Sequence, residues 1–207
     1  MTSEEYKEWL KDNYKRIRKS IADCAQLNYR NPGDITIVAV SKTFPPETIE
    51  LAYQAGIRSF GENYAQELRF KMQYFANSSI KPDWHFIGHL QSNKVKYLIP
   101  NVKLIHTVDD VDLAKEIDKR ANAAGIVQNI LIQVNTSGEP QKSGVEPDNL
   151  INLVSDVIDL KNVNLIGLMT IGTFTDDESI SRREFSLLAK LRFEANSFLG
   201  HEKLTEL

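Results

Sequence analysis

The chain has 207 residues, of which 42% are apolar and 26% charged, and its formal net charge is −3. This composition is typical of a globular protein with a substantial core, and it excludes a strongly basic nucleic-acid binder and a membrane-spanning protein. The single cysteine, Cys24, excludes an intrachain disulfide and a cysteine-based zinc site. Because the charged N-terminus lacks the apolar core of a signal peptide, we expect a cytoplasmic protein.

Hydrophobic periodicity predicts a leading helix at 4–28, followed by alternating strands and helices. On the leading helix, Cys24 belongs to the apolar stripe and is expected to face the core. Runs of strand length follow at 35–40, 58–61, 84–88, 104–108, 129–134 and 163–171. Further helices are predicted at 45–56, 64–75, 91–98, 111–121, 150–157 and 179–198.

Strands that alternate with helices at this spacing form βα units with a parallel sheet. The spacing alone leaves two architectures open, a doubly wound sheet and a closed eight-stranded barrel. No glycine-rich nucleotide-binding loop follows any of the predicted strands. We expect a single domain over 1–207, with the leading helix in 1–30 and the βα units in 35–207.

Lys42 is the most informative polar residue, because it comes just after the apolar run at 35–40. In a parallel βα fold the functional groups lie at the carboxyl ends of the strands. A lysine there is expected to be partly desolvated, which favours the neutral amine that forms a Schiff base with an aldehyde cofactor. The alternatives are a lysine that extends into solvent or one that binds a phosphate as a point charge.

Polar residues also follow the second predicted strand. Glu62 and Asn63 could supply a hydrogen-bonding pair at the site. Alternatively, Asn63 only caps the next helix, with Gln66 three residues later as in a capping box.

The remaining candidates come from later strand ends. His85, His89 and His106 lie in or after separate strands, so structural histidines are favoured over metal ligands, and no metal is expected. Lys142 lies in a loop between two prolines. It is either an ordinary exposed lysine or a basic group at the edge of the site.

Five segments in order along the chain resemble the pyridoxal-phosphate homeostasis protein family: AVSKTFPPETI, GIRSFGENYAQEL, WHFIGHLQSNK, NTSGEPQKSG and GLMTIG. The resemblance covers about 35–195. It implies an α/β fold, a TIM-type (β/α) barrel of the alanine racemase N-terminal kind, here with an extra N-terminal helix.

The resemblance also implies that the chain binds pyridoxal 5′-phosphate (PLP) covalently, as an internal aldimine on Lys42. We expect Asn63, His85, Met169 and Thr170 to surround the cofactor, and Lys142 is a weaker candidate for a lysine that receives or passes on PLP. The implied role is PLP and vitamin B6 homeostasis without a known catalytic reaction. The expected partners are PLP and PLP-dependent apo-enzymes, with no nucleic acid or membrane, and the expected state is a monomer or weak homodimer.

Two other functions remain open at this point. One is a PLP-dependent amino-acid racemase or lyase. Racemisation needs a base on each face of the bound substrate, and only Lys42 can be assigned to one face. The other is an interaction protein whose PLP site is vestigial.

The family's chain continues beyond its last long helix with a segment resembling S-M-G-M-S-x-D and a strand ending in V-R-I-G, which supply the last two strands and the phosphate cradle. This sequence ends at HEKLTEL. We therefore expect six strands of eight, with the outer edges of the first and sixth strands unpaired. We also expect weak PLP binding.

Overall fold

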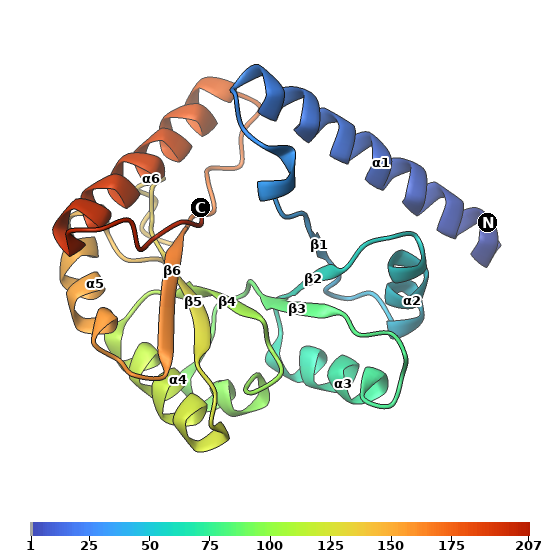
Figure 1. The fold of residues 1–207 in the computed structure, drawn as a ribbon, viewed down its shortest axis with the longest axis horizontal. Helices are drawn as coiled ribbons and strands as arrows, with labels where there is room; N and C mark the ends of the chain where they lie inside the picture. The colour runs from blue at the N-terminus through green and yellow to red at the C-terminus, as the bar shows by residue number, and fades with distance from the viewer. Residues whose placement is uncertain (1) are drawn as a thin grey trace. The chain divides into compact units, whose positions relative to one another are not determined.

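The computed structural model describes residues 2–207, and the chain divides into two compact units, Met1–His85 and Phe86–Leu207 (Figure 1). The first unit contains α1 (Ser3–Leu27), η1 (Pro32–Asp34), β1 (Val38–Val40), α2 (Pro46–Gln54), β2 (Ser59–Glu62), α3 (Ala65–Phe75) and most of β3 (Asp83–Phe86). The second contains η2 (Ser92–Tyr97), β4 (Leu104–Val108), α4 (Val111–Ala124), β5 (Gln128–Gln133), η3 (Pro147–Asn149), α5 (Leu150–Ile158), β6 (Val163–Met169) and α6 (Glu178–Leu199).

The leading helix α1 begins with a capping box. The Thr2 hydroxyl accepts a hydrogen bond from the Glu5 backbone N–H at 3.2 Å, and the Glu5 carboxylate accepts from the Thr2 N–H at 2.7 Å. Within the first unit α1 contacts α2 and η1. Ala25 is the one buried residue of the helix and Cys24 is exposed, so the prediction that Cys24 faces the core is wrong. The apolar periodicity marks Cys24 as part of a stripe, but burial depends on which side of the helix the neighbouring elements cover. In α1 that side is the one that carries Ala25.

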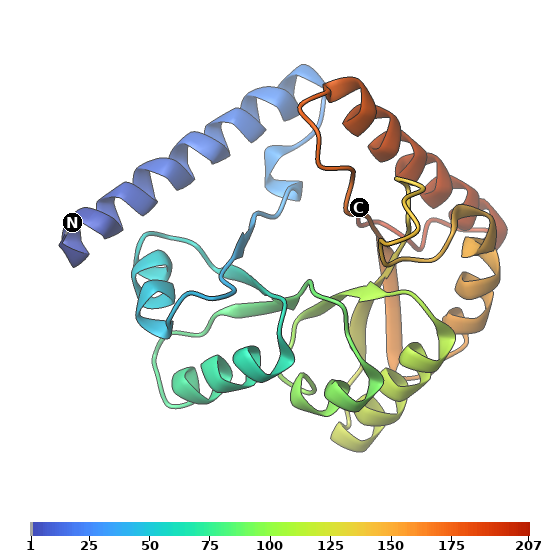
Figure 2. The same cartoon turned by 180° about the vertical axis from the view of Figure 1, so that it is seen from behind.

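The strands of the first unit are parallel and adjacent. β1 pairs with β2 in the register Val38↔Ser59, Ala39↔Phe60 and Val40↔Gly61. Phe60 on β2 and Trp84 on β3 lie 6.1 Å apart between ring centroids, and Trp84 lies 6.0 Å from Phe75 of α3. These contacts define the side of β2 and β3 that α3 covers, and α3 is the teal helix of Figure 2.

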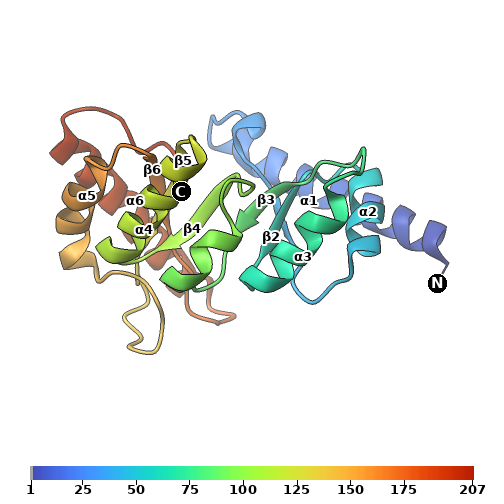
Figure 3. The ribbon, with the colours of Figure 1, turned by 90° about the horizontal axis from the view of Figure 1, so that it is seen from below.

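In the second unit β4, β5 and β6 are parallel neighbours, and α4 and α5 pack along them (Figure 1). The N-cap of α4 is Asp110, whose carboxylate accepts from the Leu113 N–H at 2.8 Å. The loop after β5 and the segment after β6 extend to the same edge of the unit, at the bottom of Figure 3. This arrangement follows from the parallel strands, whose carboxyl ends share one edge.

Several predicted elements differ from the structure in their bounds or type, and three of them bear on the strand ends. β1 begins at Val38 instead of residue 35, since β2 offers pairing partners only from Ser59 onward. The predicted helix at 91–98 is the 3₁₀ helix η2, in which Leu98 N–H donates to the Val95 carbonyl, three residues earlier. β6 ends at Met169, two residues earlier than predicted.

Residues near the C-terminus pair with β6. The N–H groups of Thr205 and Glu206 donate to the Ile166 carbonyl at 2.9 and 3.0 Å, and Leu168 N–H donates to the Glu206 carbonyl at 3.2 Å. Gly167 and Glu206 thus form a parallel bridge. The prediction that the outer edge of the sixth strand is unpaired is therefore wrong over Ile166–Leu168, because these two C-terminal residues run alongside it.

None of the helices in the part of the chain that the structure describes is both long and apolar enough to span a membrane. Within residues 2–207, no three His, Cys, Asp or Glu side chains come close enough together to hold a metal ion.

Gly167→Ala should loosen the pairing between β6 and the C-terminal residues. A Cβ at this position would overlap the Glu206 carbonyl oxygen and lie 2.6 Å from the Glu206 carbonyl carbon. We expect a loss of about 1–3 kcal/mol in the free energy of unfolding, measured by urea titration, together with faster amide exchange at Thr205 and Glu206.

Glu206→Ala is the matched control, because it keeps the backbone pairing and removes only an exposed side chain. Its stability should lie within about 0.5 kcal/mol of the parent. An equally stable Gly167→Ala with unchanged exchange would contradict the observed pairing.

Candidate functional site

Lys42 lies in a β-turn directly after β1. Ser41 N–H extends the pairing to β2 by donating to the Gly61 carbonyl at 2.9 Å, and Phe44 N–H closes the turn by donating to the Ser41 carbonyl at 3.2 Å. The Lys42 side chain is exposed, and its amine has no hydrogen bond or ion pair with any residue in 2–207. The prediction that Lys42 is partly desolvated is therefore wrong. The strand before it is short and open to solvent, with Val40 50% exposed.

Asn63 occupies the equivalent position after β2. Lys42 and Asn63 each lie two residues past the paired residues Val40 and Gly61. Asn63 does not cap α3: the N-cap residue is Tyr64, and no side chain caps the helix. The capping-box interpretation is therefore wrong, because the helix begins one residue later than it requires. The Oδ1 atom of Asn63 is buried and has no hydrogen-bond partner among the described residues. A buried amide oxygen of this kind can still accept a donor from a ligand.

Alternation of side chains places three of the predicted site residues on one face of the first unit's strands. Phe60 on β2 and Trp84 on β3 point toward α3. Because successive side chains of a strand point to opposite faces, residues an odd number of positions from Phe60 on β2, or from Trp84 on β3, point away from α3. His85 therefore faces away from α3, as does Asn63, and the same alternation continued through Ser41 brings Lys42 to that face. His85 is 4% exposed and lies one residue before the end of β3. The Lys42 amine, the Asn63 amide and the His85 imidazole thus lie at or near the carboxyl ends of β1, β2 and β3.

Met169 and Thr170 lie at the end of β6 in the second unit. Met169 is half-buried, and its carbonyl accepts from the Val134 N–H at 2.8 Å. The Thr170 hydroxyl donates to the Val134 carbonyl at 2.9 Å and lies 2.8 Å from the Thr136 hydroxyl. Its one proton is therefore engaged in joining β6 to β5. That these two residues surround the same cofactor as Lys42 stays a prediction.

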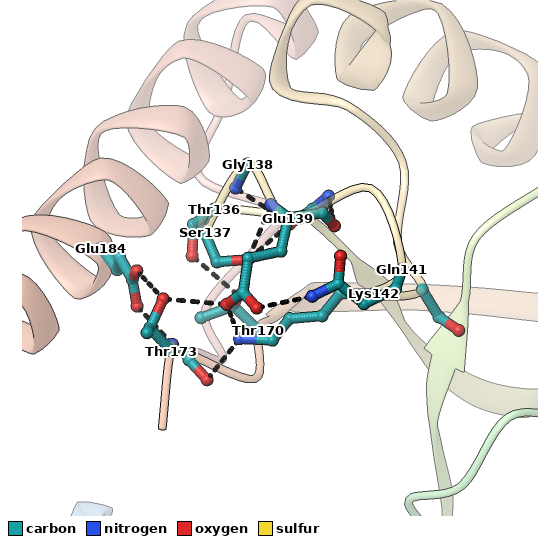
Figure 4. Close-up of polar contacts among 12 residues, drawn as sticks. Thr136, Ser137, Gly138, Glu139, Gln141, Lys142, Thr170, Thr173 and Glu184 are labelled. Carbon is teal, nitrogen blue, oxygen red and sulfur yellow. Dashed lines mark hydrogen bonds and ion pairs between the residues drawn. The ribbon is translucent and has the colours of Figure 1, made fainter. Parts of the chain in front are cut away.

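Lys142 is part of a polar cluster in the second unit, together with Glu139, Thr173 and Glu184 (Figure 4). The Lys142 ammonium lies 2.5 Å from the Glu139 carboxylate and 3.0 Å from the Gly172 carbonyl oxygen. Lys142 is half-buried, so it is not an ordinary exposed lysine. Because an ammonium in an ion pair is not a nucleophile, Lys142 must leave Glu139 before it could react with an aldehyde.

Thr173 connects the two carboxylates of this cluster. Its hydroxyl lies 2.7 Å from Glu184 Oε1 and 3.1 Å from Glu139 Oε1, and its N–H donates to Glu184 Oε2 at 2.8 Å. The Thr173 hydroxyl holds the pKa of Glu184 below its usual range, and the hydrogen bond from Lys142 does the same for the pKa of Glu139. The cluster therefore joins the loop after β5 to the segment after β6 and to α6.

Two helices carry buried charged residues that are not among the predicted site residues. Lys71 lies on the inner stripe of α3 between Leu68 and Phe75, and Glu184 lies on the inner stripe of α6 before Leu188. Lys71 is 1% exposed and Glu184 2% exposed. A charged residue at helical spacing within an apolar stripe was the signal that could have revealed both.

Thr173→Val should make the pH dependence of stability shallower in acid. A carboxyl whose pKa is lower in the folded state stabilises the protein fully above its unfolded pKa of about 4.3. That contribution is lost as the pH falls through the folded pKa. Removing the hydroxyl raises the pKa of Glu184 toward its ordinary value. The variant should therefore be less stable than the parent at pH 7, and the difference should shrink as the pH falls below about 4.

Urea titrations at pH 7, 5, 4 and 3 measure this effect. Thr175→Val is the control, because the Thr175 hydroxyl contacts the Asp177 backbone N–H and no carboxylate. The stability difference for that variant should not change with pH. A Thr173→Val difference that stays constant from pH 7 to pH 3 would contradict the assignment.

Comparison with known proteins places this arrangement in a family. The model of the alanine racemase N-terminal domain matches residues 9–198. The pyridoxal phosphate homeostasis protein of Aquifex aeolicus (strain VF5) is 42% identical over 179 residues, which is 86% of this chain and 78% of the relative.

Two solved structures are similar over most of the chain. A protein of Bifidobacterium adolescentis described as unknown has a TM-score of 0.88 and 33% identity, covering 98% of this chain and 85% of that one. PipY of Synechococcus elongatus PCC7942, solved with PLP bound, has a TM-score of 0.78 and 31% identity, covering 90% and 87%. The strand–helix order and these matches agree on the predicted α/β fold of the alanine racemase N-terminal kind. The chain belongs to the pyridoxal phosphate homeostasis protein family.

Proposed function

We propose that this chain binds PLP through Lys42 and acts in PLP homeostasis. The observation that carries the proposal is the position of Lys42, an unpaired amine at the carboxyl end of β1 on the same face as Asn63. Its relatives are named for PLP homeostasis, and PipY has been solved with PLP bound. Together these support a cofactor site built around Lys42.

The chemistry requires only the residues present and the cofactor. PLP, when bound, supplies an aldehyde and a phosphate. With the cofactor bound, the Lys42 amine would form a C=N bond to the aldehyde carbon and the aldehyde oxygen would leave as water, so no oxidant or reductant would be needed. No ion pair holds Lys42 within residues 2–207, so none has to break first. The link is reversible in water, which suits a protein that holds PLP and releases it to PLP-dependent apo-enzymes.

Asn63 is proposed as the first polar neighbour of the bound cofactor. Its register position matches that of Lys42, and its buried Oδ1 lacks a partner among the described residues. His85, on the same face of the first unit's strands, is proposed as a further neighbour of the cofactor, and the part played by Met169 and Thr170 stays a prediction. The role is proposed to be that of a carrier, without conversion of an amino-acid substrate.

Lys42→Ala should abolish covalent PLP attachment. Purified protein mixed with PLP is reduced with borohydride and digested, and the modified peptide is identified by mass spectrometry. We expect one PLP on the peptide that contains Lys42, because this amine is unpaired within residues 2–207 and lies on the same face as Asn63 at the strand ends. Lys115→Ala, at an exposed lysine on α4, is the control and should be labelled like the parent. Label on Lys142 or another lysine, with Lys42 unmodified, would refute the proposed site.

The PLP-loaded protein should not racemise amino acids. Incubation with several L-amino acids at saturating PLP, followed by chiral chromatography, should give no more D-amino acid than PLP alone, because racemisation needs a base on each face and only Lys42 has been assigned. Formation of a D-amino acid that disappears in Lys42→Ala would show that the chain is an enzyme.

A further inference from the structure

The turn that carries Lys42 is held by a buried cluster of charges in the first unit. The Lys71 ammonium lies 2.8 Å from the Ser41 carbonyl oxygen, 2.7 Å from Glu62 Oε1 and 2.7 Å from Glu67 Oε1. These three acceptors match the three protons of an ammonium. The cluster therefore satisfies the hydrogen bonds of a lysine that is 1% exposed.

The same cluster contacts the backbone on both sides of Lys42. Ser41, the residue before Lys42, accepts from Lys71 through its carbonyl, and its hydroxyl donates to Glu62 Oε1 at 2.6 Å. Thr43, the residue after Lys42, donates its N–H to Glu67 Oε1 at 2.7 Å. These bonds connect the turn to α3, the helix that carries Glu67 and Lys71.

The backbone of the turn is one that threonine adopts reluctantly. Thr43 has a φ of 67°, in the left-handed region, where a β-branched residue is strained. Such a conformation persists only where the surroundings hold it. The Glu67 carboxylate, bonded to the Thr43 N–H, is the group that holds it here.

The cost of burying this cluster argues that it does more than stabilise the fold. Taking a lysine and two carboxylates out of water costs nearly as much as their attraction returns, so a buried ion cluster is weak evidence for stability. Burial raises the pKa of Glu62 above its usual range, and Glu62 Oε2 has no partner in the described part of the chain. Apolar residues in place of the whole cluster, at positions 62, 67 and 71 together, would fill the same space at lower cost.

We propose that Lys71 and Glu67 are positioning residues that fix the Ser41–Phe44 turn and thereby hold the Lys42 amine in place for PLP. The inference rests on the proposed function of Lys42, and it adds residues that do not touch the cofactor themselves. Loss of the cluster should leave the Lys42 amine chemically intact but mobile, so attachment slows because the reacting geometry is populated less often.

Glu67→Ala tests the proposal in the whole 207-residue chain. Glu67 is the more exposed partner, with 24% of its side chain accessible, so this variant is expected to fold. Lys71→Met would leave two carboxylates buried without their cation, and it is therefore only a supporting variant. Glu67→Gln is the conservative variant, because its amide oxygen can still accept from the Thr43 N–H.

The matched control is Glu116→Ala on α4. Glu116 also pairs with a cation four residues later, Arg120 at 2.6 Å, and its side chain is 21% exposed. This control removes a helical ion pair whose carboxylate is exposed to a similar degree, although its cation Arg120 is more exposed than Lys71, and it does so in the second unit. Any general effect of losing such a pair appears in this control.

Two measurements are made on each variant. Without PLP, amide hydrogen exchange at Thr43 and Phe44 should become at least tenfold faster in Glu67→Ala and change less than threefold in Glu67→Gln and Glu116→Ala. With PLP, the rate of borohydride-trapped attachment at Lys42 should fall about tenfold or more in Glu67→Ala alone. A tenfold loss corresponds to about 1.4 kcal/mol.

The outcomes separate this inference from the proposed function. A lower melting temperature in Glu67→Ala with parental exchange at the turn and a parental attachment rate would mean that the cluster is only structural, and it would overturn the inference. If the parent attaches PLP elsewhere than Lys42, the proposed function fails, and the cofactor part of the inference falls with it. Faster exchange together with slower attachment at Lys42, restored by Glu67→Gln, supports it.

Discussion

The alternation of side chains along paired parallel strands is the constraint on which the candidate site depends. In the first unit the register Val40↔Gly61 brings the ends of β1 and β2 level with each other. Residues that point toward α3 build the aromatic contact of Phe60 and the charged cluster of Glu62. The next residues along the chain, Lys42 after Ser41 and Asn63 after Glu62, point away from α3. A single register thus divides the same short segments into a side that packs against α3 and a side that carries the candidate site residues.

Buried charges connect the loops at the strand ends to the helices behind them. Lys71 on α3 bonds to the residue before Lys42, and Glu184 on α6 bonds to Thr173 in the segment after β6. In each unit, a charged side chain on an otherwise apolar helical stripe meets the backbone or hydroxyl of a loop. Strand-end loops have few apolar contacts of their own, so such polar contacts are what orders them.

Much of the fold could be predicted from the sequence because local patterns determine it. The six strands and most of the helices lie within two or three residues of their predicted bounds. The errors concern contacts between elements. Cys24 lies on the apolar stripe of α1 yet is exposed, and the outer edge of β6 is paired by Glu206. Neither follows from the periodicity of one segment.

The sequence by itself determined the alternation of strands and helices, the family, and the placement of Lys42 and Asn63 at consecutive strand ends. These depend on residue spacing and on motifs, which a chain carries before it folds. Only the tertiary structure decided that Lys42 is exposed and unpaired, that Asn63 does not cap a helix, and that Lys71 reaches the Ser41 carbonyl. The physical reason is that burial and hydrogen bonding depend on distances between segments 21 to 30 residues apart, as between Ser41 and Glu62 or Lys71. Such distances exist only once the strands have paired and the helices have packed against them.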